Sequence, residues 1–259
     1  MTDRDLQKLA DMLYLAEWER IPVPPLTESC GELTVDDAYA IQMKNINRAV
    51  AMGYQISGKK IGLTSVGIQS QFGVNEPDYG HLFTAMDCRD GIVETAELIQ
   101  PRIEAELAFI LRSDLSGGKV TVGDVHNATE YAVGAFEIVD SRVADWKIKL
   151  ADTVADNASS GRYILGEKRL GVKDVSLPDV SMKLFRKGGF VGEGTGAYVQ
   201  GDPCAAVAWL ANRLWDYGVT LKKGQIVLSG AFSAALPAQK GDVFSVEFSS
   251  FGTVKAEFR

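Results

Sequence analysis

Histidine and cysteine are scarce in this chain, and their scarcity limits the chemistry that it can perform. The 259 residues include two histidines and three cysteines. Cys30, Cys88 and Cys204 stand far apart, without the paired spacing of a zinc site or a disulfide framework. His81 and His126 cannot build a histidine-rich metal centre, so a metal would have to be held by oxygen ligands. No G-x-S-x-G motif is present and neither histidine lies in a nucleophile motif, which leaves serine or cysteine hydrolase chemistry with little support.

Blocks of positive charge and long apolar runs are also missing. The formal net charge is -7, and no basic stripe is interleaved with aromatic residues, which argues against nucleic acid as a partner. The N-terminal segment has no signal-peptide pattern, and no apolar run reaches the length of a membrane span. We therefore expect a cytoplasmic protein whose partners are small molecules or other subunits.

The first 56 residues predict a helical segment. Apolar residues recur at helical spacing up to a proline-rich break at 21–26. A second apolar stripe follows the capping pattern at 34–37 and can end at Gly53. We expect residues 1–56 to form this helical segment and residues 57–259 to form the body of the protein.

From Gly58 onward the pattern changes to short strands and turns. Two helices interrupt them, one from Thr121 toward Tyr131 and one from Asp202-Pro203 to Gly218. The last strands predict a hairpin that turns near 251–252, and the glycine-rich stretch 192–196 is interpreted as a flexible loop because it lacks the spacing of a dinucleotide fingerprint. With 46% hydrophobic residues the chain can bury a substantial core, so the fold class is α+β with a β-rich mixed-sheet body.

The strand predicted at 101–111 carries two glutamates on one face. Alternation places Glu104 and Glu106 on one side and Ile103, Ala105 and Leu107 on the other. The two glutamates are about 7 Å apart along the backbone, so their carboxylates can converge on one small object. A solvated strand face is the simpler interpretation of the same pattern.

Glu137 lies within a second apolar run, where solvation is harder to argue. An unpaired buried carboxylate is costly, so Glu137 calls for a cationic partner, for which Arg102 and Arg142 are the candidates. The alternative is that Glu104, Glu106 and Glu137 together bind a hard divalent cation such as magnesium.

Three further stretches carry polar residues of interest. In G-K-K-I-G-L-T, Lys60, Gly62 and Thr64 share one face and Lys59 lies on the other, with the glycine leaving room for a ligand. Asp78 is predicted in a proline-containing turn. The segment D-T-V-A-D-N-A-S-S-G at 152–161 is more polar than a generic loop.

These stretches together resemble the 2-hydroxypenta-2,4-dienoate hydratase and 4-oxalocrotonate decarboxylase family, within the fumarylacetoacetate hydrolase superfamily. The resemblance is nearly end to end. It includes G-K-K-I-G-L-T-S at 58–65, P-D-Y-G at 77–80, Q-P-R-I-E-A-E at 100–106, F-E-I-V-D-S-R at 136–142, D-T-V-A-D-N-A-S at 152–159 and the terminal β region.

The resemblance implies a set of functional residues and partners. It implies Mg²⁺ or Mn²⁺ held by Glu104, Glu106 and Glu137, where the ion acts as a Lewis acid on a 2-hydroxy or 2-oxo dienoic acid. It implies that Lys60 and Asp78 are catalytic and that Leu63, Thr64, Ser159 and Ser160 contact the substrate. It also implies a homo-oligomer and a complex with a neighbouring enzyme of the aromatic meta-cleavage pathway.

Hydration of 2-hydroxypenta-2,4-dienoate to 4-hydroxy-2-oxopentanoate is the expected reaction, with decarboxylation of 4-oxalocrotonate as the alternative. The wall predicted to face the far end of the substrate, residues 231–236, has no Arg or Lys to pair a second carboxylate, which favours the vinyl substrate. A carbon–carbon bond hydrolase would need a histidine–glutamate dyad built on His81 or His126. An inert binding protein of the same fold is expected to have lost the three carboxylates, and all three are present.

Overall fold

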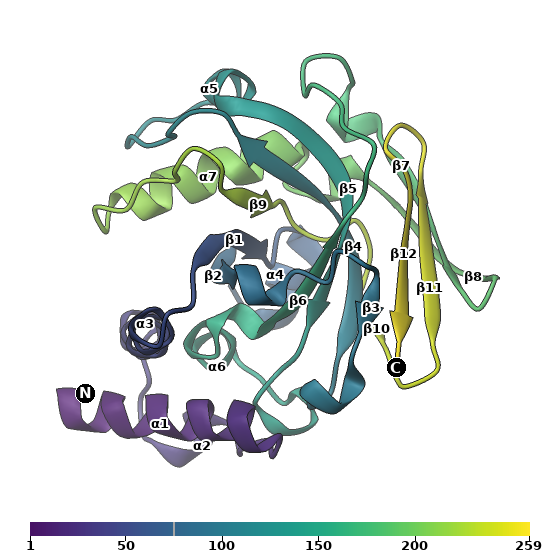
Figure 1. Ribbon diagram of the computed structural model, residues 1–259. Helices are drawn as coiled ribbons and strands as arrows, with labels where there is room; N and C mark the ends of the chain where they lie inside the picture. Colours follow the sequence, from purple (N-terminus) through teal and green to yellow (C-terminus); the bar gives the residue numbers. More distant parts are fainter. Residues whose placement is uncertain (75) are drawn as a thin grey trace.

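The computed structural model describes residues 1–74 and 76–259 as a mixed α+β protein (Figure 1). Its helices are α1 Asp3–Glu19, α2 Leu26–Ser29, α3 Val35–Ala51, α4 Val66–Phe72, α5 Val122–Ala128, α6 Leu150–Ala155 and α7 Pro203–Trp215. Its strands are β1 Ile56–Gly62, β2 Asp78–Phe83, β3 Ile92–Val93, β4 Arg102–Leu111, β5 Thr129–Val139, β6 Ser160–Leu165, β7 Ser181–Arg186, β8 Gly189–Thr195, β9 Ile226–Leu228, β10 Leu236–Pro237, β11 Val243–Phe248 and β12 Gly252–Phe258. Among the described residues, no helix is both long and apolar enough to cross a membrane.

The N-terminal helices form where the sequence predicts them. Thr2 caps α1, and Thr34 with Asp37 makes a capping box at the start of α3, which satisfies backbone N–H groups that would otherwise lack partners. The buried stripe of α3 packs against α1 on one side and against α6 on the other. Figure 1 shows these helices gathered on the side of the molecule opposite the β11–β12 hairpin.

Two sheets make up the body. Within the described residues, the larger sheet has seven strands in the order β2-β1-β9-β4-β5-β6, with β10 paired to β4, and the smaller has five in the order β3-β12-β11-β7-β8. The smaller sheet packs on the face of β4 and β5 that carries Ile103, Ala105, Leu107 and Phe136, and this layer is the main core. The opposite face of the large sheet carries a second, smaller apolar cluster, which includes Ala108, Ala135 and Leu228, and beside it the residues of the site.

Several local predictions are corrected. Residues 192–196 belong mostly to β8 and its turn instead of a flexible loop, because the alternating backbone pairs with β7. The helix from Thr121 ends at Ala128, and Tyr131 already lies in β5. Asp78 begins strand β2, where it pairs with Gly62 of β1, and does not lie in a turn. The terminal hairpin of β11 and β12 is confirmed.

Candidate active site

Three glutamates converge on the face of the large sheet that points away from the smaller sheet. Glu104 on β4 stands directly opposite Glu137 on β5, and Glu106 follows Glu104 on the same face. One carboxylate oxygen from each lies within 4.8 Å of the others. The backbone N–H of Gly230 donates to Glu106 Oε2 at 2.8 Å. Alternation along β4 places Glu104 and Glu106 on one face. The antiparallel register between β4 and β5 then adds Glu137 to the same face.

Burial and mutual repulsion perturb all three carboxyl groups. Burial, followed by the Glu137 and Glu104 charges, raises the pKa of Glu106 well above its usual range. Burial also raises the pKa of Glu104, against the attraction of Lys60. For Glu137, burial is the largest cause of a pKa of about 7, which Lys60 restrains. A cluster of this kind is costly without a cation, and a divalent ion would relieve it.

The donor set fits a hard divalent cation. Carboxylate oxygens are the ligands that magnesium, calcium and manganese prefer. Glu137 Oε2 is buried and has no hydrogen-bond partner among the described residues, so it is available as a ligand. Glu104, Glu106 and Glu137 are accordingly the residues that could hold such an ion.

Lys60 supplies the cation that contacts this cluster. Its Nζ lies 3.2 Å from Glu137 Oε1, and both side chains are almost fully buried. Burial alone would lower the pKa of Lys60, but the Glu137, Asp78, Glu104 and Glu106 carboxylates together hold it above the ordinary value. The cationic partner of Glu137 is therefore Lys60. The predicted partners bind elsewhere: Arg142 pairs with Asp156, and Arg102 stacks on Trp146.

Asp78 lies beside Lys60 across the β1–β2 pair. A Cβ on Gly62 would come within 2.2 Å of Asp78 Oδ1 and 3.4 Å of Lys60 Nζ, so both functional groups occupy the space that the missing side chain leaves. Asp78 is buried and its Oδ1 has no hydrogen-bond partner among the described residues. Burial raises the pKa of Asp78, while Lys60 opposes the shift. A carboxyl group with a raised pKa is a better proton acceptor and donor for general acid–base work than an ordinary aspartate.

Lys59 lies on the other face of β1, as alternation predicts. It is nevertheless buried, and burial lowers its pKa to about 8. Its register partner His81 is also buried; burial first and Lys59 second lower the pKa of His81 well below its usual range. Because Asp78 and His81 alternate along β2, His81 faces away from the carboxylates. His81 therefore cannot form, with these glutamates, the histidine–glutamate dyad that a carbon–carbon bond hydrolase would need.

A cavity of about 1070 Å³ opens beside the cluster and is lined by Glu104 and Glu106. Lys60, Asp78, Leu63, Thr64 and Ser159 all line it, so five of the predicted catalytic and substrate-contacting residues are brought together. Positive φ angles, which non-glycine residues rarely adopt, concentrate in this lining. The non-glycine residues concerned are Leu63, Asp145, Trp146, Ala158, Ser159 and Gln200.

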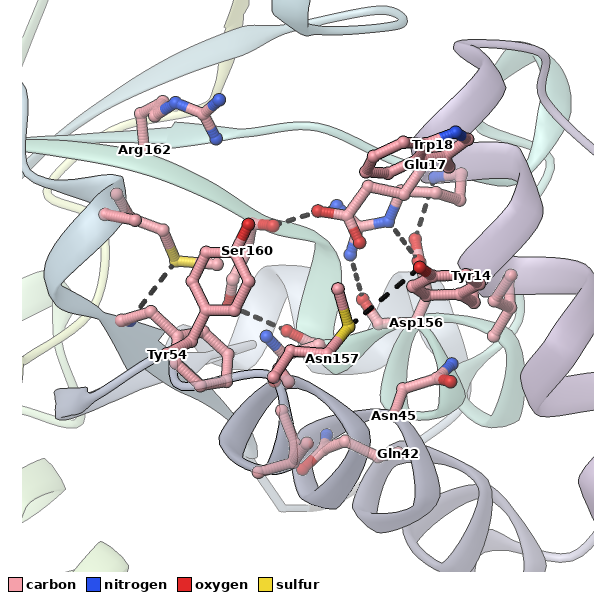
Figure 2. Close-up of a pocket in the computed structure, with 18 of the residues that line it drawn as sticks. Tyr14, Glu17, Trp18, Gln42, Asn45, Tyr54, Asp156, Asn157, Ser160 and Arg162 are labelled. Atoms are coloured by element: carbon pink, nitrogen blue, oxygen red, sulfur yellow. Dashed lines mark hydrogen bonds and ion pairs between the residues drawn. The ribbon is translucent and has the colours of Figure 1, made fainter.

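Ser160 is separated from the others. The chain leaves the left-handed turn at Ser159 and enters extended strand β6 at Ser160, so the two neighbouring side chains point to different sides. Figure 2 shows Ser160 with Asp156 and Asn157 in a second cavity, which Tyr14 and Trp18 of α1 also line. Its hydroxyl donates to the Asn157 carbonyl at 2.7 Å, which is a structural role in this turn.

The cavity also contains residues that the sequence reasoning missed. Arg102 and Trp146 both line it, with the Arg102 guanidinium carbon 4.4 Å from the centre of the Trp146 ring. One signal was present: Arg102 precedes Glu104 by two residues and so shares its face. Trp146 could not be found this way, because a local left-handed turn places it. Tyr198 and Gln200, which follow β8, also line the cavity and carried no motif.

Comparison with known proteins agrees with this architecture. The family described as fumarylacetoacetate (FAA) hydrolase C-terminal matches residues 84–259. The chain is 43% identical over 259 residues to the 2-keto-4-pentenoate hydratase of Paraburkholderia xenovorans LB400, covering 100% of this chain and 96% of the relative. It is 41% identical to the 2-hydroxyhexa-2,4-dienoate hydratase of Comamonas testosteroni, with 100% and 99% coverage. The solved structure of 4-oxalocrotonate decarboxylase from Pseudomonas putida G7, complexed with magnesium and adipate, matches with a TM-score of 0.97 at 35% identity, covering 100% and 99% of the two chains.

These matches define the class of protein. The chain belongs to the fumarylacetoacetate hydrolase family. Within it, the chain is a member of the hydratase and decarboxylase group, and both kinds of relative are lyases.

Proposed function

We propose that this enzyme hydrates 2-hydroxypenta-2,4-dienoate to 4-hydroxy-2-oxopentanoate in aromatic meta-cleavage catabolism. The observation that carries the proposal is the convergence of Glu104, Glu106 and Glu137 beside Lys60 at the base of one cavity. The full-length likeness to hydratases that act on this class of acid supports the choice of reaction.

A divalent cation, Mg²⁺ or Mn²⁺, is the proposed cofactor, with the three glutamates as its ligands. When bound, it would supply Lewis-acid polarisation of the oxygens at the carboxylate end of the substrate. The magnesium complex of the decarboxylase supports a divalent metal in this group of enzymes.

Lys60 and Asp78 are the proposed catalytic residues. The reaction removes the proton from the 2-hydroxyl, adds a proton at C5 to give a conjugated enone, and then adds water, with oxygen at C4 and hydrogen at C3. The Lys60 ammonium stabilises the negative charge that develops on the C2 oxygen. Asp78, with its raised pKa, is placed to accept and return a proton. Leu63, Thr64 and Ser159 are proposed to hold the substrate.

Decarboxylation of 4-oxalocrotonate remains the second candidate because the match to the decarboxylase is so close. Residues 231–236 contain no cation, but this does not decide between hydration and decarboxylation. Arg102 pairs with Pro237 of β10, so a cation lies beside that wall. The choice of hydration therefore depends on the hydratase relatives.

Product analysis with both substrates tests the assignment. Purified enzyme with Mg²⁺ is supplied with 2-hydroxypenta-2,4-dienoate in ¹⁸O water and, separately, with 4-oxalocrotonate. We expect the label in the 4-hydroxyl of the product and little carbon dioxide from the diacid. Efficient carbon dioxide release without hydration of the pentadienoate would assign the enzyme to the decarboxylases.

The family resemblance also supports a cytoplasmic homo-oligomer that works with a neighbouring enzyme of the pathway. Light scattering of the purified protein, alone and mixed with the aldolase or dehydrogenase class of enzyme that would consume its product, measures both forms of assembly.

A further inference from the structure

The segment that follows β9 departs from regular strand pairing beside the candidate active site. The Ser229 N–H donates to the Leu107 carbonyl at 3.0 Å, which continues the ladder between β9 and β4 in register. In a regular antiparallel pair, the next bond to β4 would join the Ala231 N–H to the Ala105 carbonyl. That carbonyl instead accepts the N–H of Phe232 at 2.9 Å. The segment therefore carries one extra residue at this point, which makes it a β-bulge.

The bulge turns one backbone donor out of the ladder and toward the site. The Gly230 N–H, which lies inside the bulge, donates to Oε2 of Glu106 at 2.8 Å. Glu106 is buried, and it lies in β4 between the two residues whose carbonyls accept the flanking ladder bonds. A hydrogen bond from an N–H to a carboxylate is stronger than one between neutral groups. The N–H of Gly230 thus holds a side chain of β4 where a regular strand would pair only with its backbone.

The backbone at position 230 has a conformation and surroundings that suit glycine. Gly230 has a φ of +115°, a region that residues with a side chain rarely adopt. A Cβ at this position would lie 2.4 Å from Thr64 Oγ1 and 2.9 Å from Thr64 Cβ. Thr64 is itself buried, and its carbonyl accepts the Gln200 N–H at 3.2 Å. Thr64 therefore packs directly against the backbone of Gly230 and limits its movement.

The far end of the bulge is anchored in the core. Phe232 is fully buried and packs edge-on against Phe248, with the ring centres 5.9 Å apart. A Cβ on Gly194 of β8 would come within 1.8 Å of the Phe232 carbonyl oxygen, so β8 also lies close against this backbone. Because both ends of the bulge are fixed, the N–H of Gly230 has little freedom to turn away from Glu106.

We propose that Gly230 is a positioning residue for the metal centre: its N–H, released from the ladder by the bulge, holds the Glu106 carboxylate in the orientation that binds the ion. Partners that hydrogen-bond a metal ligand orient it and contribute strongly to metal affinity. The proposal rests on the proposed function in one respect, namely that Glu104, Glu106 and Glu137 hold the divalent cation.

The test removes this N–H without adding bulk. Replacing Gly230 by glycolate in the full-length chain, through cell-free translation with a suppressor tRNA, converts the backbone amide to an ester that has no N–H and no side chain. Isothermal titration calorimetry with Mg²⁺ and paramagnetic resonance titration with Mn²⁺ then measure ion affinity without substrate or turnover. We expect the affinity for both ions to fall about tenfold or more, the scale for losing a partner that orients a metal ligand.

Replacement of Phe232 by phenyllactate is the matched control. It removes a backbone N–H from the same segment, but one that donates to the Ala105 carbonyl in the ladder. Thermal melts without metal establish that both ester chains are folded, and the Phe232 ester should keep the wild-type ion affinity. Gly230→Ala is a second variant, made from ordinary amino acids. It should also lose ion affinity, because its Cβ would collide with Thr64 and displace the N–H.

A double-mutant cycle with Glu106→Ala separates positioning from a general weakening of the fold. In that background the Gly230 ester should cause no further loss of ion affinity, because no carboxylate is left to position. Unchanged affinity in the Gly230 ester, an equal loss in the Phe232 ester, or an equal loss with and without Glu106 would each overturn the proposal. Failure of the proposed metal site is distinguishable: Glu106→Ala alone would then bind both ions like the wild type, and the proposal for Gly230 would fall with it.

Discussion

At the scale of single residues, the site is a balance between buried carboxylates and one buried lysine. Glu104, Glu106 and Glu137 all have raised pKa values because burial and their neighbours disfavour the charged forms. Lys60 offsets only part of this cost. The site therefore favours a positively charged ligand. Replacing one of its carboxylates should lower activity and should not lower the stability of the metal-free fold.

Glu106→Gln tests that opposition. The folded-state pKa of Glu106 lies above its unfolded value, so ionisation of this group destabilises the metal-free fold as pH rises. The neutral amide removes the repulsion and can still accept the N–H of Gly230. We expect turnover to fall by about two orders of magnitude or more, while the melting temperature without metal stays equal or rises. Unfolding of the variant with intact metal affinity would instead indicate a structural ion-pair network.

Lys60→Met and Lys59→Met separate the two faces of β1. Loss of an oriented charge beside a developing oxyanion should lower kcat/KM by about two orders of magnitude for Lys60→Met. Lys59 is buried on the opposite face with a pKa of about 8, so its replacement should change activity little and leave stability equal or higher. Steady-state kinetics and thermal melts of both variants provide the comparison. Equal losses of activity would show that the strand face on which each lysine lies does not determine its role.

At the scale of secondary-structure elements, strand pairing determines which functional groups meet. The β1–β2 pair brings Lys60 and Asp78 together because Gly62 leaves their space open. The β4–β5 pair places Glu104 opposite Glu137. Small shifts of either pair would therefore misplace catalytic groups without exposing much core.

Gly62→Ala is the corresponding prediction. The added Cβ would lie 2.2 Å from Asp78 Oδ1, so Asp78 or the strand has to move. Displacements of about 1 Å can cost about a hundredfold in rate, and we expect a loss of at least about tenfold in kcat/KM with a modest fall in melting temperature. Gly192→Ala in β8, where the structure places no atom within 4 Å of the new Cβ, serves as the control and should retain activity. An active Gly62→Ala enzyme would mean that Asp78 and Lys60 need no fixed spacing.

At the scale of the whole molecule, metal binding should couple to folding and to pH. A ligand that binds only the folded state stabilises it by an amount that grows with its concentration, about 2.7 kcal/mol at one hundred times the dissociation constant. The raised carboxyl pKa values, about 7 for Glu137, mean that the ion must displace protons at low pH.

Calorimetric melts with EDTA and with Mg²⁺ at pH 6 and pH 8 measure this coupling. We expect Mg²⁺ to raise the melting temperature more at pH 8 than at pH 6, because the glutamates are then ionised before the ion binds. EDTA should abolish turnover and added Mg²⁺ or Mn²⁺ should restore it. Full turnover in metal-stripped enzyme, or a melting temperature indifferent to Mg²⁺, would contradict the assignment of the three glutamates.

The sequence by itself determined the features that depend on local periodicity. Alternation placed Glu104 and Glu106 on one face and separated Lys60 from Lys59; apolar residues at helical spacing located α1, and a capping pattern followed by an apolar stripe located α3. The residue types also restricted any metal centre to oxygen ligands. Each of these follows from the geometry of a few neighbouring residues.

The tertiary structure decided what depends on long-range pairing. It made Lys60 the partner of Glu137 in place of the two predicted arginines, stacked Arg102 on Trp146, and turned Ser160 into a different cavity from Ser159. These outcomes require the register between distant strands and left-handed turns that only the surrounding fold enforces. Local sequence contains neither, because both arise when the assembled sheet fixes segments that lie tens of residues apart.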